Sequence, residues 1–339
     1  MTRFLCVPSI NGHTLVKLCP VGRAYRWRTW PMTLYVHPMA ARVKRSSIHF
    51  ARAAVLLSTL VVVASPGCGR SGEYVVTERE SNGYSVFVIE DEQGVRKLRF
   101  ARDGIDQSAI VPGDPEQLVF AYMKGMMAGF ALQRDPERVL LIGLGGGTFP
   151  MFVRRHLPEA SIDIVEIDPV VVDVASGHLG FREDERMVVH VEDGRRFVEA
   201  GMPGRRWDMI ALDAYGPDMI PEHLATRQFY DAVRARLAPG GLLVANLWSE
   251  YANARYFSML RTLEDVFAEV HVVAPQKSES RVVFAFRDAV GLSREQFVDQ
   301  SVALKKAWRL RFDLPQMVFR GYAGPDALPP GGAVILDAP

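Results

Sequence analysis

The sequence predicts an α/β protein in which a mainly parallel sheet is covered by helices on both faces. From residue 138 onward, short apolar segments alternate with segments of helical spacing. Strands this apolar are typical of a parallel sheet that is buried on both sides. A glycine-rich loop follows the first of these strands, and acidic residues end the next three. Because ligands on such sheets bind at the carboxyl ends of the strands, we expect a binding site there.

The alternation extends over about 150 residues and defines the central domain, residues 116–288. Short, β-branched apolar segments indicate strands at residues 139–143, 161–167, 187–191, 207–213, 242–247, 270–274 and 281–287. Segments with helical spacing lie between them, at residues 150–157, 169–178, 195–200, 226–237 and 253–267.

Smaller regions flank the central domain. Residues 69–115 read as a small β domain, with alternating strands at 74–78, 83–90 and 95–101. One helix is expected over 114–132, because four large apolar residues recur there on one side. Residues 289–339 predict a single amphipathic helix at 293–312, followed by an end rich in proline and glycine.

The first 68 residues differ from the rest in charge. They contain nine Lys or Arg and no Asp or Glu, whereas residues 69–339 carry 31 basic and 39 acidic residues. A folded part with excess negative charge is a poor match for nucleic acid, so we expect no nucleic-acid partner. Residues 1–38 show no helical or strand period and are interpreted as an over-extended start or a disordered segment.

Residues 39–68 resemble a secretory signal. A basic stretch precedes a mostly apolar run at 53–64, which is too short to span a bilayer, and Gly67 then precedes Cys68. This order is similar to a bacterial lipoprotein signal, in which the cysteine becomes lipidated. We therefore expect an exported protein attached to the membrane through Cys68, with a cytoplasmic chain as the alternative. The three cysteines all lie in this head, so we expect no metal site in the folded part.

The first strand of the central domain runs into Gly143-Leu144-Gly145-Gly146-Gly147-Thr148. Glycines allow the backbone to turn sharply and to approach a ligand at a helix N-terminus, so Gly143, Gly145 and Gly147 are candidate binding residues. Glu166 ends the second strand, where an acidic side chain accepts hydrogen bonds from both ribose hydroxyls. A nicotinamide dinucleotide site requires a third glycine where Thr148 stands, which disfavours that cofactor.

Two further strand ends carry acidic residues. Asp193 and Gly194 follow the third strand, where a carboxylate can accept from the adenine amine and the next N–H can reach a ring nitrogen. Asp-Gly is also a common turn, so this pair gains weight only beside the glycine loop and Glu166. Asp213 ends the fourth strand and is followed by a loop that leads to Phe229-Tyr230.

In this order, these features resemble the spermidine synthase family. That family has a glycine-rich loop, a Glu-Ile-Asp strand end, an Asp-Gly and an Asp-rich loop before a helix that opens near Phe-Tyr. Gln107, in Asp106-Gln107-Ser108, matches the family's segment before the loop. The similarity covers roughly residues 74–287. It implies a Rossmann-like sheet of seven strands, in which the last two form an antiparallel hairpin, and a possible homodimer.

The resemblance also implies an activity. In the family, decarboxylated S-adenosylmethionine binds as a co-substrate, without a tightly bound cofactor, and a small amine attacks the carbon beside the sulfonium. By position in the motif, Asp213 is the base that takes the amine proton, while Asp193 and Glu166 hold adenine and ribose. Gly143, Gly145, Gly147, Gly194 and Gln107 complete the expected donor site.

The sequence departs from the family on the amine side. Gly146 and Gly216 stand where the family has aspartates, and residues 275–280 lack its tyrosine. A dicationic diamine needs several carboxylates to offset its lost hydration, so the acceptor is left open. Two other functions remain as alternatives, an S-adenosylmethionine-dependent methyltransferase on the same scaffold and a non-catalytic adenosyl-binding lipoprotein.

Overall fold

The computed structural model describes residues 9–10, 13–14, 72–216 and 220–338, and the chain divides into the units Met1–Val63 and Ala64–Pro339. In the first unit, β1 (Ser9–Ile10) and β2 (His13–Thr14) form an antiparallel pair. Apart from these four residues, the expected start at 1–38 lies outside the described residues, as do the segment at 39–68 and its Cys68.

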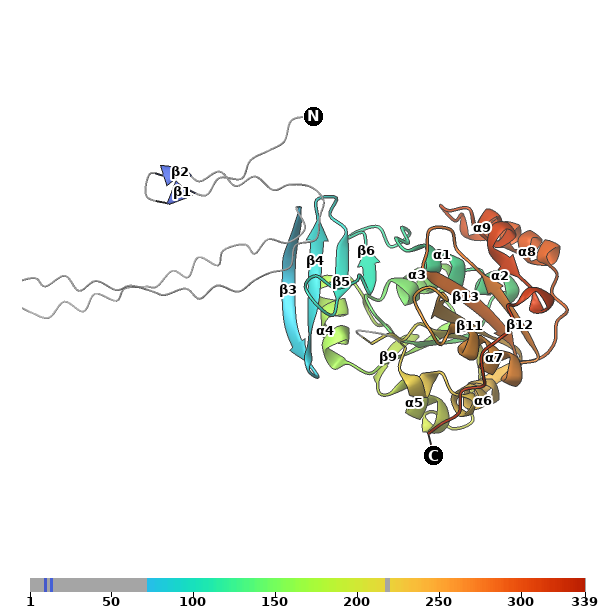
Figure 1. The fold of residues 1–339 in the computed structure, drawn as a ribbon. Helices are drawn as coiled ribbons and strands as arrows, with labels where there is room; N and C mark the ends of the chain where they lie inside the picture. The colour runs from blue at the N-terminus through green and yellow to red at the C-terminus, as the bar shows by residue number, and fades with distance from the viewer. Residues whose placement is uncertain (1–8, 11–12, 15–71, 217–219, 339) are drawn as a thin grey trace, which may run out of the picture. The chain divides into compact units, whose positions relative to one another are not determined.

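An antiparallel sheet of four strands opens this unit (Figure 1), with the strands in chain order: β3 (Glu73–Ser81), β4 (Tyr84–Asp91), β5 (Arg96–Arg99) and β6 (Ser108–Ile110). Asn82 and Gly83 join β3 to β4, and both have positive φ, as tight hairpins require. Val86 and Val88 of β4 pack against Val171 and Val174 of the central domain. The short strand β6 was not predicted from the sequence.

Two short helices, α1 (Ala121–Met126) and α2 (Gly129–Leu132), replace the single helix that was expected over 114–132. The expected helix was wrong at its start, because residues 114–120 are not helical. The Asp114 carboxylate accepts from Glu116 N, and Gln117 N bonds the Asp114 carbonyl, so these residues form a turn. Gly129 lies directly on the sheet, because a Cβ there would come 2.6 Å from Val244 Cγ2.

The main sheet has eight strands in the order β14-β12-β13-β11-β10-β7-β8-β9, which confirms the expected α/β class. Strands β7 to β11 are parallel, and β13, β12 and β14 pair antiparallel along one edge. The strand bounds are β7 (Arg138–Ile142), β8 (Ser161–Glu166), β9 (Met187–Val191), β10 (Trp207–Leu212), β11 (Leu237–Trp248), β12 (Glu269–Val273), β13 (Ser280–Phe286) and β14 (Tyr322–Ala323).

Seven of these strands were expected, and the eighth, β14, is a correction. It has only two residues and lies in the segment interpreted as an irregular end, where it pairs with Val272 and Val273 at the sheet edge. After β7, the next strands in the chain, β8 and β9, lie on one side of it, and the following strands, β10 and β11, lie on the other side. The strand order therefore reverses between β7 and β10, where such sheets bind ligands.

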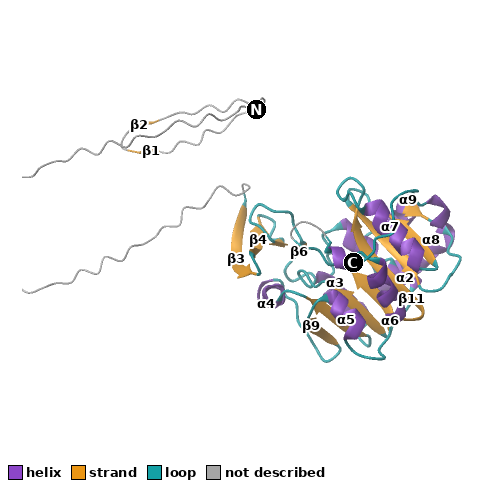
Figure 2. Ribbon diagram, turned by 60° about the horizontal axis from the view of Figure 1, so that its bottom comes forward, coloured by secondary structure: helices purple, strands orange, loops and turns teal. Residues whose placement is uncertain are grey.

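Helices cover both faces of the sheet (Figure 2). Alternate residues of each strand point to opposite faces. Leu141 and Met209 pack with Phe152 on one face, whereas Leu140 and Ile210 face the opposite way. The covering helices are α3 (Thr148–His156), α4 (Pro169–His178), α5 (Gly194–Ala200), α6 (Arg227–Arg236), α7 (Tyr256–Val266), α8 (Arg294–Trp308) and α9 (Leu314–Gly321).

The helix expected at 293–312 is present as α8 but ends at Trp308, and the helix that follows, α9, was not expected. Ser293 and Gln296 form a capping box that starts α8, which ends where Arg309 takes a left-handed conformation at φ 51°. Asp313 then caps α9. In the described residues, no helix is both long and apolar enough to cross a membrane. Nor do those residues group three or more His, Cys, Asp or Glu side chains as metal ligands.

Candidate active site

A pocket of about 730 Å³ lies at the carboxyl ends of the central strands. Residues that follow β7, β8, β9 and β10 line it, together with Tyr84, Gln107 and Tyr122 from the segments before the central sheet. Seven of the eight site residues predicted from the sequence line this pocket: Gly143, Gly145, Glu166, Asp193, Gly194, Asp213 and Gln107. The parallel sheet brings together the residues from Gly143 to Asp213, and Gln107 reaches the same pocket from the small antiparallel sheet.

Gly147 is the exception among the predicted residues. It lines a separate cavity of about 260 Å³ and not the main pocket. Its φ is +75°, and a Cβ there would lie 2.6 Å from Phe181 Cδ2. Gly147 therefore starts α3 in a conformation and a space that only glycine fits. Gly143 has a φ of +98°, and a Cβ there would lie 2.2 Å from the Asp213 carbonyl oxygen, so this position also requires glycine.

Glu166 ends β8 and lines the pocket. Its Oε2 accepts from Leu144 N at 3.0 Å, and its Oε1 accepts from Asp168 N at 3.0 Å. Burial raises the pKa of Glu166, although these two N–H groups oppose the change. Each carboxylate oxygen can accept a second hydrogen bond, so both oxygens can still receive a ligand hydroxyl.

Asp168, two residues further on, lines the same pocket but is already fully engaged. It caps α4 by accepting from Val170 N, and it accepts from Ser81 Oγ at 2.7 Å. The Tyr84 hydroxyl binds its second oxygen. This cluster joins the hairpin of the small sheet to the loop beside Glu166, a connection that the sequence did not reveal.

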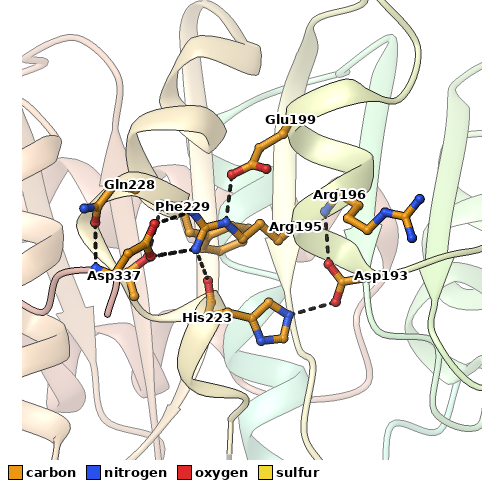
Figure 3. Close-up of polar contacts among 9 residues, drawn as sticks. Asp193, Arg195, Arg196, Glu199, His223, Gln228, Phe229 and Asp337 are labelled. Atoms are coloured by element: carbon orange, nitrogen blue, oxygen red, sulfur yellow. Dashed lines mark hydrogen bonds and ion pairs between the residues drawn. The ribbon is translucent and has the colours of Figure 1, made fainter. Parts of the chain in front are cut away.

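Asp193 lies at the end of β9, just before α5 (Figure 3). Its Oδ1 accepts from Arg196 N at 3.0 Å, and its Oδ2 lies 2.8 Å from Nε2 of His223. Burial alone would raise the pKa of Asp193, but these contacts outweigh it and lower the pKa. His223, in the 3₁₀ turn Glu222–Leu224, was not predicted, because nothing in its local sequence marks it.

Gly194 is required by packing as well as by its place beside Asp193. A Cβ at Gly194 would lie 2.5 Å from Ile142 Cγ2 of β7, so any side chain would push α5 away from the sheet.

Gln107 lies between β5 and β6 of the small sheet, where its backbone N–H donates to the Leu98 carbonyl of β5. Its side chain lines the pocket from the loop before β6.

Asp213 directly follows β10 and lines the pocket. Asn246 Nδ2 donates to Asp213 Oδ1 at 2.8 Å. Burial raises the pKa of Asp213, whereas hydrogen bonds from Asn246 and Tyr122 oppose the rise. Asn246 and Tyr122 were not predicted. Asn246 is detectable in principle as a polar residue near the end of an otherwise apolar strand, the signal that marked Glu166 and Asp213.

Aromatic rings surround Asp213. Tyr215 stacks on Trp248 with ring centroids 4.9 Å apart, and its hydroxyl donates to the Asn246 carbonyl. Phe120 stacks on Tyr122 at 5.7 Å. Such faces attract cations, so they complement the negative charge of Asp213.

The pocket wall is strongly acidic. Six carboxylates line it, against one lysine and one histidine in the described residues: Asp106, Glu166, Asp168, Asp193, Asp213 and Glu279, with Lys277 and His223. Asp106 is neutralised by Arg99 at 2.5 Å. A ligand with positive charge is therefore favoured over one with a free carboxylate.

Gly146 has a physical reason to lack a side chain. A Cβ there would lie 2.6 Å from Ser108 Oγ and 3.2 Å from Leu179 Cδ1. Ser108 of β6 thus fills the space that an aspartate would need at this position. By contrast, Gly216 and residues 277–280 line the main pocket directly.

Comparison with known proteins agrees with this geometry. Residues 120–284 match the spermine/spermidine synthase domain. A polyamine aminopropyltransferase of Vibrio vulnificus is 33% identical over 241 residues, which is 70% of this chain and 80% of the relative. The human eEF1A lysine and N-terminal methyltransferase is 30% identical over 63% of this chain, but only 33% of its own length is matched.

A solved structure gives the same fold. A spermidine synthase in complex with the transition-state analogue AdoDATO superposes with a TM-score of 0.60 at 21% identity, covering 74% of this chain and 86% of that chain. Two findings decide the family of this chain: the match of residues 120–284 to the family model, and the 33% identity over 80% of the Vibrio relative. It belongs to the spermidine synthase (polyamine aminopropyltransferase) family.

Proposed function

We propose that this protein transfers the aminopropyl group of decarboxylated S-adenosylmethionine to an amine. The observation that carries the proposal is the position of Asp213 in one pocket with Glu166 and Asp193. Two carboxylates suited to a nucleoside thus share a cavity with a third that directly follows the next central strand and can take up a proton. The family membership supports the same reaction.

The adenosine half of the donor occupies the ends of β8 and β9. Glu166 accepts from the two ribose hydroxyls through the acceptor positions that its backbone contacts leave open. Asp193 accepts from the adenine amine, and the N–H of Gly194 meets a ring nitrogen. Gly143 and Gly145 let the loop approach the sulfur side without a side chain between them.

Asp213 serves as the general base. The acceptor arrives as an ammonium with a pKa of about 10, so it must give a proton to Asp213 before its nitrogen can attack. The neutral nitrogen then attacks the methylene carbon beside the sulfonium, and the carbon–sulfur bond breaks with its electron pair going to sulfur. Methylthioadenosine leaves as a neutral molecule, and the positive charge of the sulfonium passes to the nitrogen of the aminopropylated product. Because the sulfonium is already a good leaving group, positioning supplies much of the rate.

The charge of the pocket favours the decarboxylated donor over the intact one. Intact S-adenosylmethionine carries a carboxylate that needs a cationic or N–H partner, whereas the decarboxylated form ends in an ammonium. Lys277 is the only lysine or arginine among the described residues that line the pocket, and it is exposed at the rim. The acceptor is a small amine, held by Asp213 and the faces of Tyr215 and Trp248.

Mass spectrometry of reaction products tests this function. The full chain is incubated with decarboxylated S-adenosylmethionine and, in parallel, with intact S-adenosylmethionine, each with a panel of amines that includes putrescine and monoamines. We expect methylthioadenosine and an aminopropylated amine in equal amounts. Formation of S-adenosylhomocysteine from the intact donor, with no aminopropylated product, would support methyl transfer instead.

The matched variant is Asp213→Asn, which keeps the shape of the side chain and removes the proton acceptor. We expect turnover to fall by about 10²- to 10⁴-fold, while the affinity for methylthioadenosine changes little. Equal turnover of the two proteins would remove Asp213 from the mechanism.

A further inference from the structure

The segment at residues 325–338, here called the tail segment, begins with the 3₁₀ turn Pro325–Ala327 and then packs along α6 and α7. The Ile335 carbonyl accepts from Arg227 N at 2.7 Å, and Ile335 N donates to Thr262 Oγ1 at 2.9 Å. Figure 1 shows this red end of the chain beside α5 and α6. Leu328 and Ile335 pack against the core under these helices.

Asp337 of the tail segment binds Arg195 through both carboxylate oxygens, at 2.7 and 2.6 Å (Figure 3). This pair lowers the pKa of Asp337 to about 2. A bidentate pair fixes orientation as well as distance. Arg195 is thereby held in one geometry, with Glu199 as a second partner at 2.7 Å.

Arg195 is connected to the proposed adenine end of the pocket both through the chain and through side-chain contacts. It follows Asp193 and Gly194 directly in the chain. Its Nη1 also lies 3.4 Å from the His223 carbonyl and 3.4 Å from Thr226 Oγ1. The imidazole of the same His223 holds Asp193 Oδ2 at 2.8 Å. A continuous set of contacts therefore runs from Asp337 to the carboxylate that faces the ligand.

We propose that Asp337 is a positioning residue for adenine recognition, which acts by holding Arg195 and, through His223, the Asp193 carboxylate. The inference rests on the proposed function, because it takes Asp193 as the acceptor for the adenine amine. Side chains of Arg195 and Asp337 are 18% and 33% exposed, and ion pairs this exposed contribute little to stability. The effect of the pair should therefore appear in ligand discrimination more than in unfolding.

Calorimetry with two ligands separates these effects. Methylthioadenosine carries the 6-amino group that Asp193 accepts from, whereas methylthioinosine carries a 6-oxo group that the carboxylate repels. Wild type should prefer methylthioadenosine. For Asp337→Asn, we expect the affinity for methylthioadenosine to fall roughly 3- to 10-fold while that for methylthioinosine stays the same. Asp337→Glu, which keeps the charge, should restore part of the preference.

Glu199→Gln is the matched control, since it removes the other acidic partner of Arg195 and leaves the tail segment in place. It should retain the wild-type preference. The effects of Asp337→Asn and His223→Ala should be less than additive when combined, because both act on Asp193. Melting temperatures of all variants show whether each one folds.

An unchanged preference in Asp337→Asn would overturn the proposal. So would an equal loss of affinity for both ligands, or the same effect from Glu199→Gln. If wild type binds neither ligand, the proposed function itself fails and the inference fails with it. If wild type binds methylthioadenosine and all variants match it, the proposed function stands and only the role of Asp337 is rejected.

Discussion

Asn246 donates a hydrogen bond to Asp213 across two neighbouring strands, with Nδ2 2.8 Å from Oδ1. The contact follows from the parallel pairing of β10 with β11, which places Leu212 opposite Ala245 and so brings the next residues together. It fixes one oxygen of the carboxylate and favours its charged form, while burial acts in the opposite direction. The balance of the two effects sets the pH at which Asp213 can act as a base.

The pH dependence of turnover should reflect this balance. A base works when it is deprotonated, so activity rises as the pH rises through the pKa of Asp213. Because burial raises that pKa, the acid limb should lie above the ordinary range of an aspartate. In Asn246→Leu, the charged form loses a hydrogen bond, and the limb should move to still higher pH. A kcat profile measured over pH checks this, and a limb that moves to lower pH would contradict it.

Ribose recognition predicts a loss of affinity in Glu166→Ala. Hydrogen bonds to a charged group contribute about 1.5 to 3 kcal/mol each, so methylthioadenosine should bind at least about tenfold more weakly. Glu192→Ala is the control, since Glu192 lies one residue before Asp193 but does not line the pocket. Calorimetry that gives both variants wild-type affinity would refute the assignment of Glu166.

The close contact at Gly146 predicts a stability effect. Gly146→Ala places a Cβ 2.6 Å from Ser108 Oγ, so we expect a loss of about 1 to 3 kcal/mol in the free energy of unfolding. Gly177→Ala is the control, because Gly177 lies in α4 with nothing within 4 Å of an added Cβ. Alanine is the better helix former, so that variant should be neutral or more stable. Urea unfolding distinguishes the two, and equal stability of Gly146→Ala and wild type would contradict the crowding.

We also propose that the chain is exported and attached to the membrane through Cys68. The proposal rests on the order of this segment, in which basic residues at 42–52 precede an apolar run at 53–64 and Gly67 then precedes Cys68. Intact-mass analysis of the membrane fraction should show a mature chain that begins at a lipidated Cys68. In Cys68→Ala the lipid should be lost. A cytosolic chain that retains residues 39–68 would contradict export.

Much of the central domain is predictable because its signals are local. Apolar strands alternate with helices, and Glu166, Asp193 and Asp213 each end a strand, so the parallel topology alone places them at one edge. The contacts that orient them are not local. His223 and Tyr122 reach the pocket from segments without a strand-end pattern, and Gly147 was assigned to the ligand although its space is taken by Phe181.

The ends of the folded part were predicted less well. The left-handed residue Arg309 ends the helix that was expected over 293–312 a few residues early, and a sequence pattern does not reveal which arginine adopts that conformation. β14 and the tail segment depend on partners far away in the chain, such as Val272 and Arg195. Their composition, rich in proline and glycine, indicated irregular structure, and only tertiary packing orders them.

Calorimetric titration of the full chain with S-adenosylmethionine, its decarboxylated form and methylthioadenosine tests the central claim most directly. An acidic pocket, in which Lys277 is the one lysine that the described residues contribute, should bind the decarboxylated form more tightly than the intact one, and methylthioadenosine should compete with it. A preference for the intact form would contradict aminopropyl transfer and favour methyl transfer. Failure to bind all three would contradict an adenosyl site altogether.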